Sequence, residues 1–149
     1  MEDAFLAHPA VAMCAVVGEP DAHAGEVPAA FVTLKPGSGV TGESLLAAVG
    51  PQVYERPAVP KRVVVLDALP VTAIGKIYKP ALRLRAIELK LQELLGAAAP
   101  GVPLRVQARE HGAAAVAEVE LGCAADAALE ARLKQALGAI AVQVVFRFA

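Results

Sequence analysis

The hydrophobic pattern of the chain changes its period near residue 96, and this change limits the folds open to the chain. Upstream, an apolar stripe at helical spacing predicts a helix that begins near Lys79, and its members are Leu84, Ile87, Leu91, Leu94 and Leu95. Downstream, apolar and polar residues alternate, as they do in half-buried strands. We therefore expect two parts, residues 1–95 and 96–149, joined by the Gly, Ala and Pro residues of 96–101.

The sequence of the first part predicts a small sheet flanked by helices. Short apolar runs predict strands at 11–17, 27–34 and 63–66. Helices are expected at 2–8, stopped by Pro9, and after Thr41, which can cap a stripe made of Leu45, Leu46, Val49 and Val53 and ended by Pro57 and Pro60. Residues 18–26 are polar and contain Gly and Pro, so we expect a loop there.

The sequence of the second part predicts a β-β-α-β lobe. The expected order is a strand at 104–109, a turn at His111 and Gly112, a strand at 117–121, a helix over Leu129–Ile140 and a strand at 142–148. So short a lobe buries too little surface to be firmly stable alone, and we expect it to pack on the first part or on a partner. The predicted class is α+β: a small mixed or antiparallel sheet flanked by helices, with this lobe appended.

Composition excludes several classes of protein. The 149 residues are 56% hydrophobic and 19% charged, which is not the composition of a disordered chain. A net charge of -1 argues against a duplex-binding surface, and the absence of Trp argues against a base-stacking one, so no nucleic-acid partner is expected. Neither a membrane span nor a signal peptide is recognisable, and we expect a cytoplasmic location.

The cysteines and histidines do not form a pattern of ligands. Two cysteines, Cys14 and Cys123, cannot build a disulfide framework or a four-ligand zinc site, and Cys14 lies inside a predicted strand. His8, His23 and His111 are scattered, without the spacing of a metal site. No metal site is expected.

Basic residues concentrate in the middle of the chain. Residues 61–95 carry seven bases and three acids, whereas residues 1–60 carry two bases and seven acids. An anionic ligand would therefore meet the middle segment, although a solvated helix face explains the same pattern.

Within this segment, Pro70, Thr72, Gly75 and Lys76 fall between a predicted strand and a predicted helix. Gly75 permits a backbone conformation that other residues resist, and this conformation can aim Lys76 away from the domain. A lysine is a compact cation on a flexible stem and can reach a phosphate or a carboxylate. The glycine spacing is not that of a Walker loop. Exposed loop lysines are common, so from the residue types alone an ordinary exposed loop lysine remains an open interpretation.

Five motifs in order resemble the C-terminal domain of AMP-forming acyl-CoA synthetases, the adenylate-forming superfamily. They lie within residues 1–86 and are His8–Val11, Val16–Asp21, Gly25–Val32, Pro60–Val63 and Pro70–Ile77. The resemblance implies that Lys76, in a P-x-T-x-x-G-K loop, enters the active site during adenylation, with Pro70, Thr72 and Gly75 shaping the loop.

The resemblance also implies the reaction and its participants. A carboxylic acid, expected to be a fatty acid, would react with ATP and CoA to give acyl-CoA, AMP and pyrophosphate, with Mg²⁺ accompanying ATP. The nucleotide and acyl pockets would belong to an N-terminal adenylation domain, so this chain alone is expected to be inactive and to hold no cofactor. Asp21, Gly25 and Glu26 would lie near the CoA entrance, and turn formation is the alternative for them.

Some positions depart from the family pattern. Val71 replaces a residue that is often basic, Tyr78 a polar one and Pro80 a commonly basic one. Residues beyond about 96 are not part of the usual domain. The alternative function is therefore a non-catalytic protein-interaction module that retains the fold, since the strand edges of the β-β-α-β lobe could pair with a partner chain.

Overall fold

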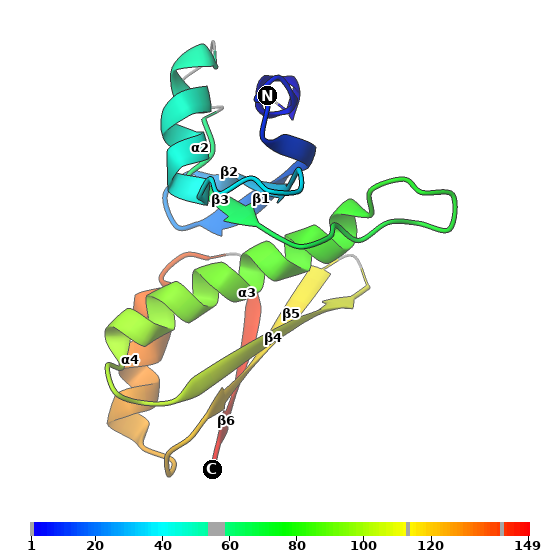
Figure 1. The fold of residues 1–149 in the computed structure, drawn as a ribbon. Coiled ribbons are helices and arrows are strands. Elements are labelled where there is room, and N and C mark those ends of the chain that lie inside the picture. Colours follow the sequence, from blue (N-terminus) through cyan, green and yellow to red (C-terminus); the bar gives the residue numbers. More distant parts are fainter. Residues whose placement is uncertain (1, 54–58, 113, 141) are drawn as a thin grey trace. The chain divides into compact units, whose positions relative to one another are not determined.

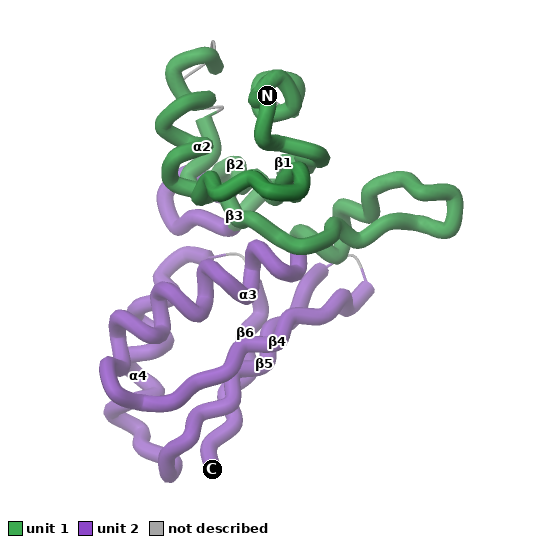
Figure 2. Tube along the Cα trace, viewed as in Figure 1, with its two compact units in different colours: residues 1–19, 27–83 green, residues 20–26, 84–149 purple. Residues whose placement is uncertain are grey.

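The computed structural model describes residues 2–53, 59–112, 114–140 and 142–149, which form two compact units. Unit 1 comprises residues 1–19 and 27–83, and unit 2 comprises residues 20–26 and 84–149 (Figure 2). Each unit has a three-stranded sheet with parallel and antiparallel neighbours, so the expected α+β class is confirmed. The proposed helix end at Pro57 lies outside the described residues.

The sheet of unit 1 has the order β1-β2-β3 (Figure 1). Its elements are α1 (Glu2–Leu6), β1 (Val11–Asp21), β2 (Gly25–Leu34), α2 (Gly42–Val49), the 3₁₀ turn η1 (Gly50–Gln52) and β3 (Arg62–Val65). β1 and β2 form a hairpin, and β3 runs parallel to β2 after the crossover through α2. The core of the unit lies between this sheet and the two helices and consists of Phe5, Val11, Cys14, Ala30, Val32, Leu45 and Val49.

Helix α2 begins where the sequence predicts and ends earlier. The Thr41 hydroxyl accepts the Ser44 N–H at 3.1 Å, and the Ser44 hydroxyl accepts the Thr41 N–H at 3.0 Å, which makes a reciprocal cap. The helix ends at Val49 and not near Val53, because Pro51 has no N–H to continue the helical ladder.

The polar segment 18–26 is not the loop that its composition predicts. β1 continues to Asp21 and β2 begins at Gly25, so only residues 22–24 connect the two strands. The reason is Glu19, which is 2% exposed and accepts two hydrogen bonds from the Arg62 guanidinium, at 2.9 and 3.0 Å. This bidentate pair joins β1 to the start of β3 and keeps Glu19 inside the strand.

Unit 2 is an α-β-β-α-β arrangement. Its elements are the helix α3 (Lys79–Ala98), whose first turn belongs to unit 1, then β4 (Leu104–His111), β5 (Ala114–Leu121), α4 (Ala127–Leu137) and β6 (Gln143–Phe148). β4 and β5 form an antiparallel hairpin, and β6 returns parallel to β5 after α4, in the order β4-β5-β6. The predicted β-β-α-β order is confirmed (Figure 1).

The helix α3 completes the core of this unit. The apolar stripe predicted from sequence places Ile87, Leu91 and Leu95 in one buried cluster with residues of β5 and α4. The helix continues through 96–98, where the sequence predicts a linker, because Leu95 and Ala99 are buried in that cluster. The chain leaves the helix at Pro100 and Gly101. The proposed domain boundary at residue 95 stays a prediction, and the compact units divide inside α3, after residue 83.

The beginning of α3 is fixed to α1 and β1 by one carboxylate. The Glu2 Oε1 accepts a hydrogen bond from the Lys79 ammonium at 2.7 Å and another from the Val16 N–H at 2.9 Å. Partial burial alone would raise the pKa of the Glu2 carboxyl. The hydrogen bonds from Lys79 and Val16 and the Lys79 charge outweigh it, and the pKa lies below its ordinary value of 4.5.

Shortening a buried side chain of α3 should weaken unit 2. Leu95 is fully buried, so Leu95→Ala is expected to lower the free energy of unfolding by about 2–5 kcal/mol. The exposed Ala97 gives the control, and Ala97→Ser should change stability by about 0.5 kcal/mol or less. Denaturant unfolding followed by circular dichroism measures both, and equal stabilities would contradict this packing.

The Glu2 contacts predict a pH dependence. Since the folded state lowers the Glu2 pKa, the contacts stabilise the fold above the ordinary pKa and are lost as pH falls through the lowered value. The amide signal of Val16 in an NMR titration should therefore shift with a midpoint below 4.5. Lys79→Met should raise that midpoint. A wild-type midpoint at or above 4.5 would show that the pair does not form.

Candidate functional site

The segment between β3 and α3 folds into a small hairpin, here called the Lys76 hairpin (residues 70–78), which Figure 1 shows as an extended loop before α3. Val71 and Ile77 form an antiparallel bridge. The Tyr78 N–H donates to the Pro70 carbonyl at 2.8 Å, and the Thr72 N–H donates to the Lys76 carbonyl at 2.7 Å. These contacts give the loop a fixed stem.

Thr72 and Gly75 shape the tip of this hairpin. The Thr72 carbonyl accepts the Gly75 N–H at 2.9 Å, and the Thr72 hydroxyl accepts the Lys76 N–H at 3.2 Å. Gly75 has a φ of +80°, a conformation that favours glycine. A Cβ on Gly75 would meet no atom within 4 Å, so the backbone angle and not the available space calls for glycine there.

The Lys76 side chain is exposed at the end of this turn. Within the described residues its ammonium has no hydrogen bond and no ion pair. The structure thus brings Pro70, Thr72, Gly75 and Lys76 together in one hairpin and leaves the cation available to an outside anion. Their roles in a reaction stay predictions.

The carboxylate of Glu2 fixes the C-terminal end of the Lys76 hairpin. Through Lys79 it connects the residue after the hairpin stem to α1 and, by the Val16 N–H, to β1. Glu2 and Lys79 are 77 positions apart, so no local pattern indicates the pair. At the other end, Arg62 is held by Glu19. The segment that carries Lys76 therefore starts and ends at charged contacts within unit 1.

Asp21, Gly25 and Glu26 flank the turn between β1 and β2: Asp21 ends β1, and Gly25 and Glu26 begin β2. All three belong to unit 2. The Asp21 Oδ1 accepts the N–H groups of His23 and Ala24, both at 2.9 Å, and these bonds lower the pKa of the Asp21 carboxyl. Gly25 has a φ of +78° and Glu26 is exposed. The hydrogen bonds of Asp21 account for the shape of the turn, and the proposed proximity of the three residues to CoA stays a prediction.

Among the described residues, the cysteines and the other potential metal ligands do not form a cluster. Burial, with the nearby Glu2 charge, raises the pKa of the Cys14 thiol to about 12, so Cys14 is inert near neutral pH. In the described parts of the chain, no group of three His, Cys, Asp or Glu side chains could hold a metal ion. No helix there is long and apolar enough to cross a bilayer.

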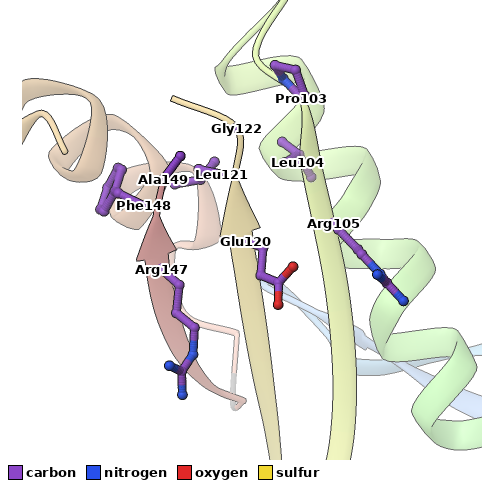
Figure 3. Close-up of a pocket in the computed structure, with 9 residues that line it drawn as sticks. All are labelled: Pro103, Leu104, Arg105, Glu120, Leu121, Gly122, Arg147, Phe148 and Ala149. Carbon is purple, nitrogen blue, oxygen red and sulfur yellow. The ribbon is translucent and has the colours of Figure 1, made fainter. Parts of the chain in front are cut away.

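A hollow of about 470 Å³ lies at one end of the sheet of unit 2 (Figure 3). Its lining includes the apolar Leu104, Leu121 and Phe148 and the charged Arg105, Glu120 and Arg147. Every residue that lines it falls between 103 and 149, so none of the predicted site residues takes part.

Comparison with known proteins identifies the family of the chain. Residues 1–76 match the family model of the AMP-binding enzyme C-terminal domain. Among curated relatives, a marinolic acid–CoA ligase of a Pseudoalteromonas species is 37% identical over 65% of this chain and 15% of its own length. An acetyl-coenzyme A synthetase of Pyrobaculum arsenaticum is 40% identical over 70% of this chain and 14% of its own.

Solved structures agree with the sequence match. MatB from Rhodopseudomonas palustris superposes with a TM-score of 0.56 at 31% identity, over 59% of this chain and 17% of its own. An acyl-CoA synthetase of Brucella canis gives a TM-score of 0.54 at 39% identity, over 60% of this chain and 17% of its own. The chain thus spans about one sixth of these relatives, and the family expected from its motifs is confirmed. The chain belongs to the family of AMP-binding enzyme C-terminal domains, the C-terminal domains of AMP-forming ligases.

Proposed function

We propose that this chain is the C-terminal domain of an ATP-dependent acyl-CoA synthetase and that it supplies Lys76 to the adenylation half-reaction. The observation that carries the proposal is the Lys76 hairpin, in which a fixed turn presents an exposed ammonium with no partner among the described residues. The family match ends at Lys76, and the relatives named above include CoA ligases and an acyl-CoA synthetase, which support the same reaction class.

The chemistry explains why a cation is needed. A substrate carboxylate attacks the α-phosphorus of ATP, a new acyl-oxygen-to-phosphorus bond forms, and the bond to pyrophosphate breaks. Two anions approach each other, and negative charge then grows on the leaving pyrophosphate. An ammonium placed between the carboxylate and the α-phosphate lowers that repulsion and stabilises the transition state. In this proposal Mg²⁺ accompanies ATP, and the residues that coordinate the Mg²⁺ belong to the adenylation domain.

The Lys76 hairpin suits such a role because its own hydrogen bonds fix the turn that carries the lysine. Thr72 and Gly75 fix the turn, while Glu2 and Lys79 fix its attachment to the domain. A preorganised donor costs little reorganisation at the moment of reaction. The rest of the active site is proposed to belong to the adenylation domain, which is the partner, so this chain alone should not catalyse the reaction.

In the second half-reaction the CoA thiol loses its proton and attacks the acyl carbonyl of the acyl-adenylate. A thioester bond forms, and the bond between the acyl group and AMP breaks. The proposal places the β1–β2 turn with Asp21, Gly25 and Glu26 near CoA in that step. The bonds of Asp21 to its own turn support a shaping contribution more than direct substrate binding. A fatty acid is the proposed acid, supported by a relative named as a medium/long-chain-fatty-acid–CoA ligase, and the cytoplasm is the proposed location.

A second candidate function, a non-catalytic interaction module, is favoured by one observation. Residues 77–149 lie beyond the family match, and the sheet that they contain has β4 and β6 as its two edge strands. An edge strand can accept a strand of another protein. The experiment below separates the two functions, because a module would bind an adenylation domain without restoring turnover.

The test uses a chimera in which this chain replaces the C-terminal domain of a related acyl-CoA synthetase. The chimera should catalyse ATP–pyrophosphate exchange with a carboxylic acid. Lys76→Ala should lower that exchange by about 10²- to 10³-fold, because it removes a preorganised cation from the transition state. Thioester formation from supplied acyl-adenylate and CoA should stay near the level of the unsubstituted chimera.

Lys61 gives the control, since it is also an exposed lysine of unit 1 and lies outside the Lys76 hairpin. Lys61→Ala should leave both half-reactions unchanged. Equal losses of both half-reactions in the Lys76 variant would reduce Lys76 to a structural role. A folded chimera that binds ATP and shows no exchange would contradict the proposed function.

A further inference from the structure

The tip of the Lys76 hairpin carries an isoleucine almost completely in solvent. Ile74 is 87% exposed, and no other large hydrophobic side chain in the described parts of the chain is as exposed. Val71, on the same hairpin, is 51% exposed. Both are apolar side chains within a few residues of the free Lys76 ammonium.

The fold of unit 1 gives no reason for an isoleucine at this position. Gly75 supplies the positive φ of the turn, and Thr72 supplies the hydrogen bonds that close it. Ile74 is absent from the buried clusters of the described residues. A polar residue would be compatible with the same turn, so the apolar side chain gains free energy only where another surface covers it.

We propose that Ile74 and Val71 are a docking surface for an apolar patch of the adenylation domain beside the nucleotide phosphates. This inference rests on the proposed function. Two arguments identify the adenylation domain as the partner that covers Ile74. One is the short spacing between Ile74 and Lys76 along the chain, and the other is the length of the relatives. A position two residues away lies at most roughly 7 Å along the chain, so a hairpin that brings Lys76 to the α-phosphate carries Ile74 to the same wall. The relatives that this chain matches are about seven times as long as the matched part, and most of their surface lies outside it.

Burial of Ile74 would act on the adenylation step in two ways. It would stabilise the inserted position of the hairpin, because apolar surface leaves water only in that position. It would also remove water from the surroundings of the Lys76 ammonium, and the attraction between an ammonium and a phosphate strengthens as the local dielectric constant falls. A step that does not use the inserted hairpin would gain neither effect.

The test measures both half-reactions in the chimera while the side chain at 74 is varied. Ile74→Ser should lower ATP–pyrophosphate exchange by roughly 10- to 100-fold, and Ile74→Val should lower it only slightly, so that the loss follows the apolar area removed. Thioester formation from supplied acyl-adenylate should stay unchanged. Because Ile74 is exposed, neither variant should alter the fold, and circular dichroism checks this.

The matched control is Leu6→Ser, which removes a 47% exposed apolar side chain of α1, outside the Lys76 hairpin, and should leave exchange unchanged. Full exchange in Ile74→Ser, with Lys76→Ala still inactive, would overturn the docking surface and leave the proposed function intact. Equal loss of both half-reactions in Ile74→Ser would also overturn it. If Ile74→Ser instead abolished self-association in sedimentation experiments, the occupant would be a second copy, and the inference would be wrong.

Discussion

The proposed role of Lys76 in adenylation depends on the turn that Thr72 closes. One residue provides the carbonyl for Gly75 and the hydroxyl for Lys76, and Gly75 adopts the backbone angle that the reversal requires. The turn leaves the Lys76 ammonium exposed. A buried, internally paired lysine could not reach a nucleotide on another domain, so this exposure is the property that the proposed chemistry needs.

The charged contacts on either side give the hairpin a defined base. Arg62 is held at the start of β3 by Glu19, and Lys79 is held at the start of α3 by Glu2. The Glu19 carboxylate is buried, and its two hydrogen bonds to the guanidinium offset the loss of hydration. The Glu2 pair is partly exposed, and its contribution to stability is correspondingly modest. Both pairs fix geometry more than they add stability.

The sequence predicts those features whose cause is local. The cap at Thr41, the stripe of α3 and the β-β-α-β order follow from residue types and spacing, and the structure confirms them. The Gly75 turn is also local, and its positive φ agrees with the expectation. The roles of Lys76 and its neighbours in catalysis come from family resemblance and remain proposals.

Features that depend on distant partners could not be predicted. Residues 18–26 have the composition of a loop. Glu19 nevertheless lies in a strand, where it pairs with Arg62, which is 43 positions further along the chain. The sequence predicts a linker at residues 96–98. The helix includes them instead, because Leu95 and Ala99 are buried against β5 and α4. The Glu2–Lys79 pair has no local signal at all. In each case a tertiary contact outweighs the local preference.

The claim that a positive charge at position 76 drives adenylation is tested most directly by replacing Lys76 with a cysteine that is then converted chemically to a cation. In a chimera with Lys76→Cys and Cys123→Ser, whose adenylation domain has had its reactive cysteines replaced by serine, bromoethylamine converts the new thiol to a lysine analogue. The buried Cys14, whose pKa is about 12, stays unmodified. The account predicts that aminoethylation restores ATP–pyrophosphate exchange and that the neutral product of iodoacetamide does not. Equal recovery with both reagents, or with neither, would show that a positive charge at position 76 does not drive adenylation.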